Sequence, residues 1–237
     1  MNGELVRVID LFSGIGGFSL GLEWAGMQSI AFCEIDARAS AVLQKHWPNV
    51  RNYGDVRTAS FRRGFADVIC GGFPCQDLSR AGRQAGIGGD RSGLWSEYAR
   101  IISDVRPQFV IVENVATLLG RGIGRVLGDL AALGYDAEWE CIQAAAVGYP
   151  HSRDRVWIVA YPNGQRQLQP GWGIGYKRRW VGDESKAVDW ILSGGGILRS
   201  HDGVPAGMDR IAGCGNAIVP QIAEAIGREI ISSVANI

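Results

Sequence analysis

The fold class of this chain is indicated by its N-terminal segment, Leu5-Val6-Arg7-Val8-Ile9-Asp10-Leu11-Phe12-Ser13-Gly14-Ile15-Gly16-Gly17-Phe18. Its first half, up to Leu11, is an apolar run typical of a buried strand, and its second half is a glycine-rich turn that opens a helix reaching about Leu22. A glycine turn after a first strand serves NAD, FAD and many other nucleoside ligands. Ser19 occupies the place of the third glycine of the dinucleotide pattern, so the loop alone does not identify the ligand.

An acidic residue ends the second predicted strand, which runs from Ser29 to Phe32. Glu34 lies 20 residues after Gly14, where a carboxylate commonly binds the hydroxyl groups of a ribose. The glycine loop and Glu34 together favour an adenine nucleoside as the ligand. They do not distinguish a nicotinamide cofactor from a sulfonium cofactor.

Predicted strands and helices alternate along the rest of the chain, as in a doubly wound sheet. Asp36 is positioned to cap one helix, and the last helix begins at Pro220. Two late strands, Tyr135 to Ala144 and Arg155 to Tyr161, are close enough in sequence to pair antiparallel at a sheet edge. We therefore predict an α/β fold, with a doubly wound sheet, an antiparallel edge strand and a small irregular appendage. Further predicted elements are helices over 94–105 and 123–133 and strands over 67–70 and 108–112.

The clearest chemical signal is the loop Gly71-Gly72-Phe73-Pro74-Cys75-Gln76-Asp77-Leu78-Ser79, which follows the predicted strand 67–70. Ligands of open α/β sheets bind at the carboxyl ends of the strands, and Pro74 restricts the backbone in front of the thiol. Cys75 lies among loop-forming residues, which favours a nucleophile over a core residue. Buried positions are instead expected for the cysteines in strand-like runs, Cys33, Cys70 and Cys141.

Composition limits the class of protein. The 237 residues are 46% hydrophobic and 20% charged, without an apolar run of membrane-spanning length or a signal peptide, so a cytoplasmic protein is expected. The five cysteines form no CxxC pair and show no ligand spacing with the three histidines, so neither a metal site nor a disulfide framework is expected. The formal net charge is zero, so any nucleic-acid surface must be a local patch.

Seven short segments follow one another along the chain in a recognisable order. They are Asp10-Leu11-Phe12-Ser13-Gly14-Ile15-Gly16-Gly17-Phe18, Glu34-Ile35-Asp36, Gly54-Asp55-Val56, Gly72-Phe73-Pro74-Cys75-Gln76, Glu113-Asn114-Val115, Arg153-Asp154-Arg155 and Gly215-Asn216-Ala217-Ile218-Val219-Pro220. In this order they resemble the motifs of the C5-cytosine DNA methyltransferases. The resemblance implies a Rossmann-like methyltransferase sheet, S-adenosylmethionine (S-adenosyl-L-methionine) as cofactor, and double-stranded DNA as substrate.

Two groups of site residues are implied by this resemblance, position by position. Asp55 would bind the adenine amino group, and Cys75 would add as a thiolate to C6 of a flipped-out cytosine, because C5 alone is too weak a nucleophile. His151 stands where the family usually has Gln. The cofactor group is Phe12, Gly14, Gly16, Gly17, Glu34, Ile35, Asp55, Val56 and Asn216, and the catalytic group is Cys75, Glu113, Arg153 and Arg155.

Composition changes between Pro162 and Gly207, where Gly, Trp, Arg and Pro become frequent. Its basic and aromatic residues suit contacts with phosphates and bases, and equally suit a solvated linker. We expect a catalytic core over 1–161, a short target-recognition insert over 162–207, and a C-terminal segment over 208–237 that returns to the core. An insert this short, by the family's standard, implies a short or relaxed target sequence, or a protein partner.

Three functions remain open from the sequence. The first is a DNA cytosine-C5 methyltransferase of a restriction-modification system, a phage or a prophage. The second is a tRNA cytosine-C5 methyltransferase with the same motifs, and the third is a non-catalytic DNA-binding relative. The segment 80–92, rich in glycine and arginine, is expected to close over the flipped base if the protein is an enzyme.

Overall fold

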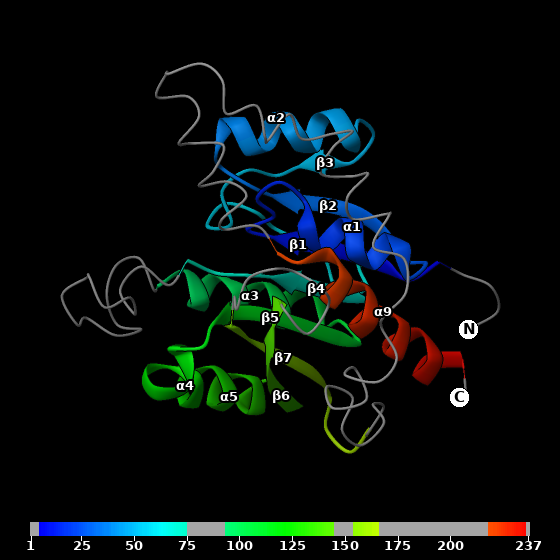
Figure 1. The fold of residues 1–237 in the computed structure, drawn as a ribbon. Coiled ribbons are helices and arrows are strands. Elements are labelled where there is room, and N and C mark those ends of the chain that lie inside the picture. Colours follow the sequence, from blue (N-terminus) through cyan, green and yellow to red (C-terminus); the bar gives the residue numbers. More distant parts are fainter. Residues whose placement is uncertain (1–4, 75–92, 145–153, 166–217, 236–237) are drawn as a thin grey trace.

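The computed structural model describes residues 5–74, 93–144, 154–165 and 218–235, which form a twisted sheet flanked by helices (Figure 1). Within these residues the sheet has seven strands in the order β3-β2-β1-β4-β5-β7-β6. The strands are β1 Arg7–Leu11, β2 Gln28–Cys33, β3 Arg51–Asn52, β4 Val68–Gly71, β5 Phe109–Val115, β6 Tyr135–Gln143 and β7 Asp154–Pro162. The helices are α1 Gly17–Trp24, α2 Ala37–His46, α3 Leu94–Val105, α4 Leu118–Arg121, α5 Ile123–Ala132 and α9 Pro220–Ala235.

Strands β1 to β5 are parallel, and β7 pairs antiparallel with both β5 and β6. This confirms the predicted doubly wound sheet with an antiparallel edge. The chain runs outward from β1 in both directions, so the carboxyl ends of β1 and β4 lie at the point where the strand order reverses. Ligands of open α/β sheets bind at such a point.

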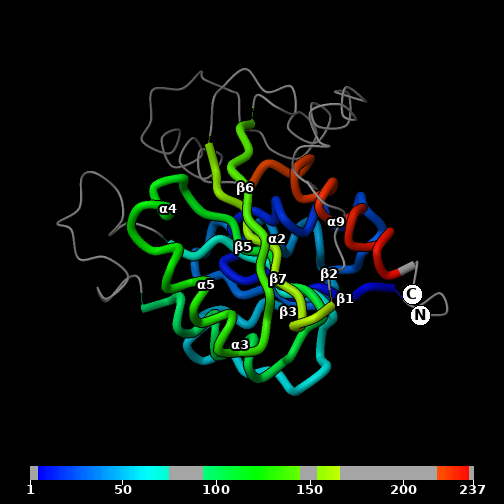
Figure 2. Tube along the Cα trace, turned by 90° about the horizontal axis from the view of Figure 1, so that it is seen from below, coloured from blue at the N-terminus to red at the C-terminus, as the bar shows by residue number. Residues whose placement is uncertain are grey.

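Two apolar layers hold the sheet between its helices. Figure 2 shows α3, α4 and α5 on one side of the sheet and α9 on the other. Helix α9 packs on α1 closely enough that a Cβ on Gly21 would lie 2.8 Å from the Cβ of Ala223, and a Cβ on Gly17 would lie 2.7 Å from the carbonyl oxygen of Ile218, two residues before α9. The segment that leads into α9 therefore lies directly against the end of the glycine loop that follows β1.

Strand β5 is longer than the sequence predicted. The expected end was Val112, but β5 continues to Val115 and so contains Glu113. On one side β4 pairs with β5 only as far as Val112, opposite Gly71, whereas on the other side β7 pairs as far as Val115, opposite Arg155. The antiparallel neighbour therefore extends β5 past the edge of the parallel strands.

The prediction for Cys141 is wrong. Cys33 and Cys70 are buried as expected, but Cys141 is exposed on β6, next to Ile142, whose side chain is buried. An outermost strand has a neighbour on one side only, and its residues are buried only where a helix covers that face.

No helix of the described residues is long and apolar enough to cross a membrane.

Candidate active site

The loop after β1 and the carboxylate of Glu34 form the first part of the site. The Gly14 N–H donates to Oε2 of Glu34 at 2.7 Å, and the Asp36 N–H donates to Oε1 at 2.7 Å. Gly14 has φ +54°, and no described atom lies within 4 Å of a Cβ built there, so none of the described residues covers the backbone at this position. Phe12 also has φ +54°, which is unusual for a bulky residue and marks a constrained turn.

Asn52 at the end of β3 connects two predicted cofactor segments through hydrogen bonds. Its Oδ1 accepts hydrogen bonds from the N–H groups of Glu34 and Gly54, each at 3.0 Å, and its Nδ2 donates to the carbonyl oxygen of Glu34 at 3.0 Å. The loops after β2 and β3 are therefore joined through one amide side chain. Sequence reasoning missed Asn52; its only signal was a polar residue shortly before Gly54.

Asp55 lies in the turn after β3, where its carboxylate is held by Arg57. The Nη2 of Arg57 lies 2.6 Å from Oδ2 of Asp55, and these hydrogen bonds lower the pKa of Asp55. The neighbouring Val56 has its side chain in the core at 4% exposure, so Val56 would meet a ligand only through its main chain. Ile35, in contrast, is 72% exposed and adds an apolar surface beside Glu34.

These features fit the adenosine part of S-adenosylmethionine. The carboxylates of Glu34 and Asp55 are acceptors suited to ribose hydroxyls and an adenine amino group, and exposed Ile35 is suited to a flat aromatic ring. The open backbone at Gly14 leaves room for a ligand beside the loop. Gly16 and Gly17 have a packing role as well, because a Cβ on Gly16 would meet the ring of Trp47 and a Cβ on Gly17 would meet the main chain of Ile218.

The second part of the site is an ion pair on the antiparallel strands. Nε of Arg155 lies 3.0 Å from Oε1 of Glu113, with the two side chains 20% and 9% exposed. Glu113 faces Trp157 in the strand pairing, and Arg155 lies two residues before Trp157 in β7, opposite Val115. The two side chains are thus diagonal neighbours on one face of the sheet, within reach of each other.

The backbone leading to Cys75 is anchored beside this ion pair. Nδ2 of buried Asn114 donates to the carbonyl oxygen of Phe73 at 3.1 Å. A Cβ on Gly72 would lie 3.0 Å from Oε2 of Glu113, so a glycine permits the strand end to approach the carboxylate. The structure thus brings Gly72, Glu113 and Arg155 together, while the predicted site residues Cys75, Arg153 and Asn216 lie outside the described residues.

Asp10 lies on β1 between the two parts and was not predicted as a functional residue. Its side chain is fully buried, and Oδ2 accepts a hydrogen bond from Oγ of Ser19 in α1 at 2.7 Å. Burial raises the pKa of Asp10 to about 7, against the smaller opposing effect of Ser19. The signal in the sequence was a carboxylate within an apolar strand.

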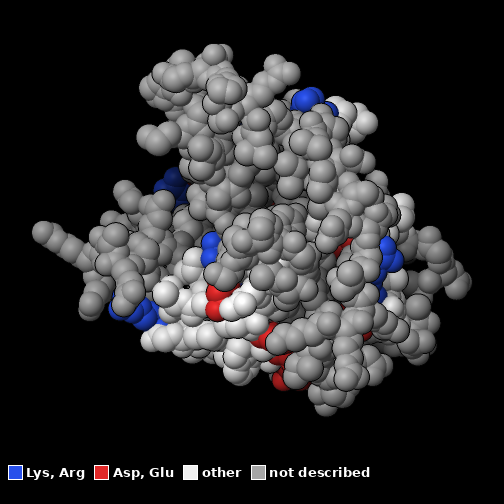
Figure 3. Space-filling view, viewed as in Figure 1, with Lys and Arg blue, Asp and Glu red and all other residues white. Residues whose placement is uncertain are grey.

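The charged surface of the described residues is mixed. On the face shown in Figure 3, their visible acidic and basic side chains include both signs, and neither sign forms a continuous patch among them. The predicted basic segment from Arg166 to Arg179 lies outside the described residues. Among the described residues, no group of His, Cys, Asp and Glu is placed to hold a metal ion.

The sheet order and the antiparallel β5–β7 pair define the class of protein as a Rossmann-like fold with methyltransferases as structural neighbours. One neighbour, described as a DNA modification methyltransferase encoded within a prophage of E. coli, has a TM-score of 0.55 and 26% identity over 66% of this chain and 47% of its own. The Dnmt2 methyltransferase of S. pombe has a TM-score of 0.56 over 68% of this chain and 51% of its own. At 20% identity, that likeness shows the fold alone.

The family of C-5 cytosine-specific DNA methylases matches residues 6–180, and the chain belongs to this family. Among its curated relatives are two Type II methyltransferases, M2.BsuMI of Bacillus subtilis, 37% identical over 163 residues, and M.Eco47II of Escherichia coli, 38% identical over 172 residues. These matches cover 65% and 69% of this chain, and 42% and 41% of the relatives. The chain therefore spans less than half the length of either relative.

Proposed function

We propose that this protein transfers a methyl group from S-adenosylmethionine to C5 of a cytosine in double-stranded DNA, through a covalent bond between Cys75 and C6. The observation that carries the proposal is the Glu113–Arg155 ion pair, which lies beside the strand end that leads to Cys75. Membership of the C-5 cytosine-specific DNA methylase family supports it. The Type II methyltransferases among the relatives favour a role in modification of DNA, as in a restriction-modification system.

The proposed cofactor contacts come from the loops after β1, β2 and β3. Glu34 would accept hydrogen bonds from the ribose, Asp55 would accept one from the adenine amino group, and Ile35 would pack on the adenine ring. When bound, S-adenosylmethionine supplies an electrophilic methyl group. The remaining contacts are proposed for Phe12, Gly14, Gly16, Gly17, the main chain of Val56, and Asn216.

The proposed chemistry makes C5 of cytosine nucleophilic. The thiolate of Cys75 adds to C6, and the positive charge of Arg153 would favour ionisation of that thiol. Glu113 in its protonated form would donate a hydrogen bond from Oε2 to N3 of the base, while Oε1 stays bound to Arg155. After C5 has been methylated, loss of its proton and expulsion of the thiolate restore the aromatic ring.

Access to C6 requires that the base leave the duplex, because stacking buries this atom. We propose that segment 80–92 closes over the flipped base. The insert 162–207 would contact DNA, and its small size would allow a short or relaxed target sequence, or require a protein partner. The division into a core over 1–161, this insert and a C-terminal segment over 208–237 belongs to the same proposal.

A trapping experiment tests the reaction directly. The protein is incubated with S-adenosylmethionine and duplex DNA that contains 5-fluorocytosine, which cannot lose a proton from C5 after methylation. The wild type should form a covalent protein–DNA adduct, Cys75→Ala should form none, and the control Cys141→Ala, which changes an exposed cysteine on β6, should behave like the wild type. An adduct that survives in Cys75→Ala would contradict the assignment.

The substrate is tested by measuring transfer of a radioactive methyl group to duplex DNA and to tRNA under the same conditions. Methylation of DNA alone is the expected result. Transfer to tRNA alone would favour the RNA enzyme, and binding of DNA without transfer to either substrate would favour a non-catalytic relative.

A further inference from the structure

The turn from Asp55 to Ala59, after β3, carries one of the proposed cofactor residues without belonging to a helix or a strand. Its internal hydrogen bonds run from the N–H groups of Thr58 and Ala59 to the carbonyl oxygen of Asp55, each at 3.0 Å. The side chains of Val56 and Ala59 are buried at 4% exposure. The position of the Asp55 carboxylate therefore depends on the contacts that hold this short turn in place.

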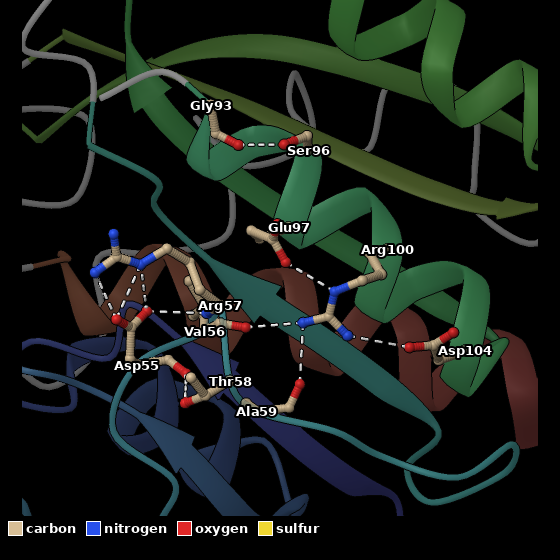
Figure 4. Close-up of polar contacts among 10 residues, drawn as sticks. All are labelled: Asp55, Val56, Arg57, Thr58, Ala59, Gly93, Ser96, Glu97, Arg100 and Asp104. Atoms are coloured by element: carbon tan, nitrogen blue, oxygen red, sulfur yellow. Dashed lines mark hydrogen bonds and ion pairs between the residues drawn. The ribbon is translucent and has the colours of Figure 1, made fainter. Parts of the chain in front are cut away.

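Arg100 reaches this turn from α3 (Figure 4). Its Nη2 donates to the carbonyl oxygen of Val56 at 2.9 Å and to that of Ala59 at 3.0 Å. One guanidinium group thus binds two main-chain carbonyls, one directly after Asp55 and one at the end of the turn. Carbonyl groups in irregular backbone need such partners when they lie next to a core.

The guanidinium group is itself held in place along α3. Nε of Arg100 donates to Oε2 of Glu97 at 2.7 Å, and Nη1 donates to Oδ2 of Asp104 at 3.2 Å (Figure 4). Glu97 and Asp104 are three residues before and four residues after Arg100, so both lie on the same side of the helix. A planar guanidinium with several fixed donors suits this set of acceptors, whereas the single ammonium of a lysine does not reproduce it.

We propose that Arg100 is a positioning residue for the cofactor, which fixes the turn that carries Asp55 in the place where Asp55 can meet the adenine. This inference rests on the proposed function, because it assigns Asp55 to the cofactor. Arg100 acts through the main chain of Val56 and Ala59. It also joins the cofactor turn to α3, the first described helix after Cys75 in the sequence.

A matched control exists on α5. Nε of Arg125 lies 2.6 Å from Oδ2 of Asp129, an ion pair with the same four-residue spacing that Arg100 has with Asp104. Helix α5 packs on β6, at the opposite edge of the sheet from β3, and its Asp129 also accepts a hydrogen bond from Nε1 of Trp95 in α3. Replacing Arg125 therefore removes a helix-surface ion pair while the Asp55 turn keeps its contacts.

Calorimetric titration with S-adenosylmethionine tests the proposal, with thermal unfolding as the check that each variant is folded. Arg100→Met should raise Kd about tenfold, the size expected when a positioned hydrogen bond to the ligand is lost, and Arg100→Lys about threefold. Arg125→Met should bind like the wild type. The rate of methyl transfer at saturating S-adenosylmethionine should stay near that of the wild type in the Arg100 variants, because Arg100 does not touch the base.

A double-mutant cycle separates positioning from general stability. If Arg100 acts through Asp55, then Arg100→Met should change Kd by less than about threefold in an Asp55→Ala background. An unchanged Kd in folded Arg100→Met, or a full tenfold effect in the Asp55→Ala background, would overturn the inference. If Arg100→Met does not fold, Arg100→Lys replaces it: its roughly threefold effect on Kd should disappear in the Asp55→Ala background, and an effect that persists there would overturn the inference. Failure of the wild type to bind S-adenosylmethionine would instead overturn the proposed function, and this inference with it.

Discussion

The adenosine side and the cytosine side of the candidate site are held in place by two different kinds of structure. Glu34 and Asp55 lie in loops after parallel strands, where hydrogen bonds between side chains and main chain fix them. Glu113 and Arg155 lie within antiparallel strands, where the pairing register already makes them neighbours. The positions of residues on the adenosine side therefore depend on separate polar side chains that hold the loops. The positions of residues on the cytosine side depend on the strand pairing of the sheet.

This difference predicts two kinds of mutational effect. Changes on the adenosine side should loosen a loop and lower the affinity for S-adenosylmethionine, because each loop relies on a few polar contacts. Changes on the cytosine side should leave that affinity nearly unchanged and lower the rate, because the strands remain paired when one side chain is replaced.

Replacing Glu113 by Gln should have the largest effect. The amide can keep a contact with Arg155, but it cannot supply an acidic proton to N3 of the base, so the rate of methyl transfer should fall by roughly 10³–10⁴-fold. Radioactive methyl transfer at saturating S-adenosylmethionine measures this loss. Calorimetry should give a Kd for S-adenosylmethionine within about twofold of the wild type, because Glu113 is not a proposed ligand of that molecule.

Glu138→Gln is the control for Glu113→Gln. Glu138 lies on the antiparallel strand β6 and accepts a hydrogen bond from the Tyr161 hydroxyl at 2.6 Å. This variant should transfer methyl groups at the rate of the wild type. A Glu113→Gln protein that keeps the wild-type rate, or one that loses affinity for S-adenosylmethionine instead, would show that the two sides are not separable.

Asp10 lies on the strand between the two sides and should make stability depend on pH. Its pKa is raised to about 7 in the folded protein, so between about pH 4 and pH 7 the folded state holds a proton that the unfolded state releases. Stability therefore falls as pH rises through this range. Since each pKa unit corresponds to about 1.4 kcal/mol, the full loss is on the order of 4 kcal/mol.

Asp10→Asn should remove this dependence, because the amide stays neutral. Urea unfolding at several pH values between 4 and 8 compares the two proteins, and the variant should gain stability relative to the wild type as pH rises. A difference in stability that does not change with pH would contradict the raised pKa. Ser19→Ala removes the hydrogen bond to Oδ2 that lowers the pKa of Asp10, so in this variant the fall in stability with rising pH should be larger than in the wild type.

On the adenosine side, Glu34→Ala should weaken S-adenosylmethionine binding by about 1–3 kcal/mol, because it removes a ligand contact and leaves the Gly14 N–H without this acceptor. Glu34→Gln should lose less, because the amide oxygen can still accept from Gly14. Calorimetry measures both values of Kd. The rate at saturating cofactor should be close to that of the wild type, and a large loss of rate with unchanged affinity would reverse the proposed contrast.

Much of the fold could be predicted because its signals are local. The helix over 94–105 and the start of α9 at Pro220 are confirmed as predicted, and Asp36 caps α2 by accepting from the N–H groups of Arg38 and Ala39. In each case the deciding residues lie within a few positions of the boundary. Periodicity, proline and capping chemistry are therefore sufficient there.

The sequence could not predict features that depend on neighbours far along the chain. The extension of β5 to Val115 requires β7 as a partner, and the exposure of Cys141 depends on the position of β6 at the edge of the sheet. The contacts of Asn52 with Glu34, and of Arg100 with Val56, are likewise set by packing between separate elements. The motifs indicated which residues surround the ligands, and the structure adds the residues that hold them.

Replacing Arg57 should have the smallest effect on the affinity for S-adenosylmethionine, and this effect can be compared directly with that of replacing Arg100. Both arginines bind the turn after β3, but Arg57 holds the partly exposed carboxylate of Asp55, whereas Arg100 holds the main-chain carbonyls of Val56 and Ala59. The hydrogen bonds from Arg57 lower the pKa of Asp55, so Arg57→Ala should let that pKa rise towards its ordinary value. Near neutral pH, Asp55 is ionised with or without Arg57, so Kd for S-adenosylmethionine should change by less than about threefold.

An NMR titration of the Asp55 carboxyl group measures the predicted rise in its pKa, and calorimetry at pH 7.5 measures the affinity. In the wild type, the lowered pKa means that this ion pair contributes stability above the ordinary pKa of an aspartate, and the contribution disappears as pH falls through the lowered value. A loss of affinity in Arg57→Ala as large as that in Arg100→Met would show that the carboxylate contact, and not the support of the main chain, positions Asp55. A small loss in Arg57→Ala beside a tenfold loss in Arg100→Met would instead show that the adenosine side is held chiefly through its backbone.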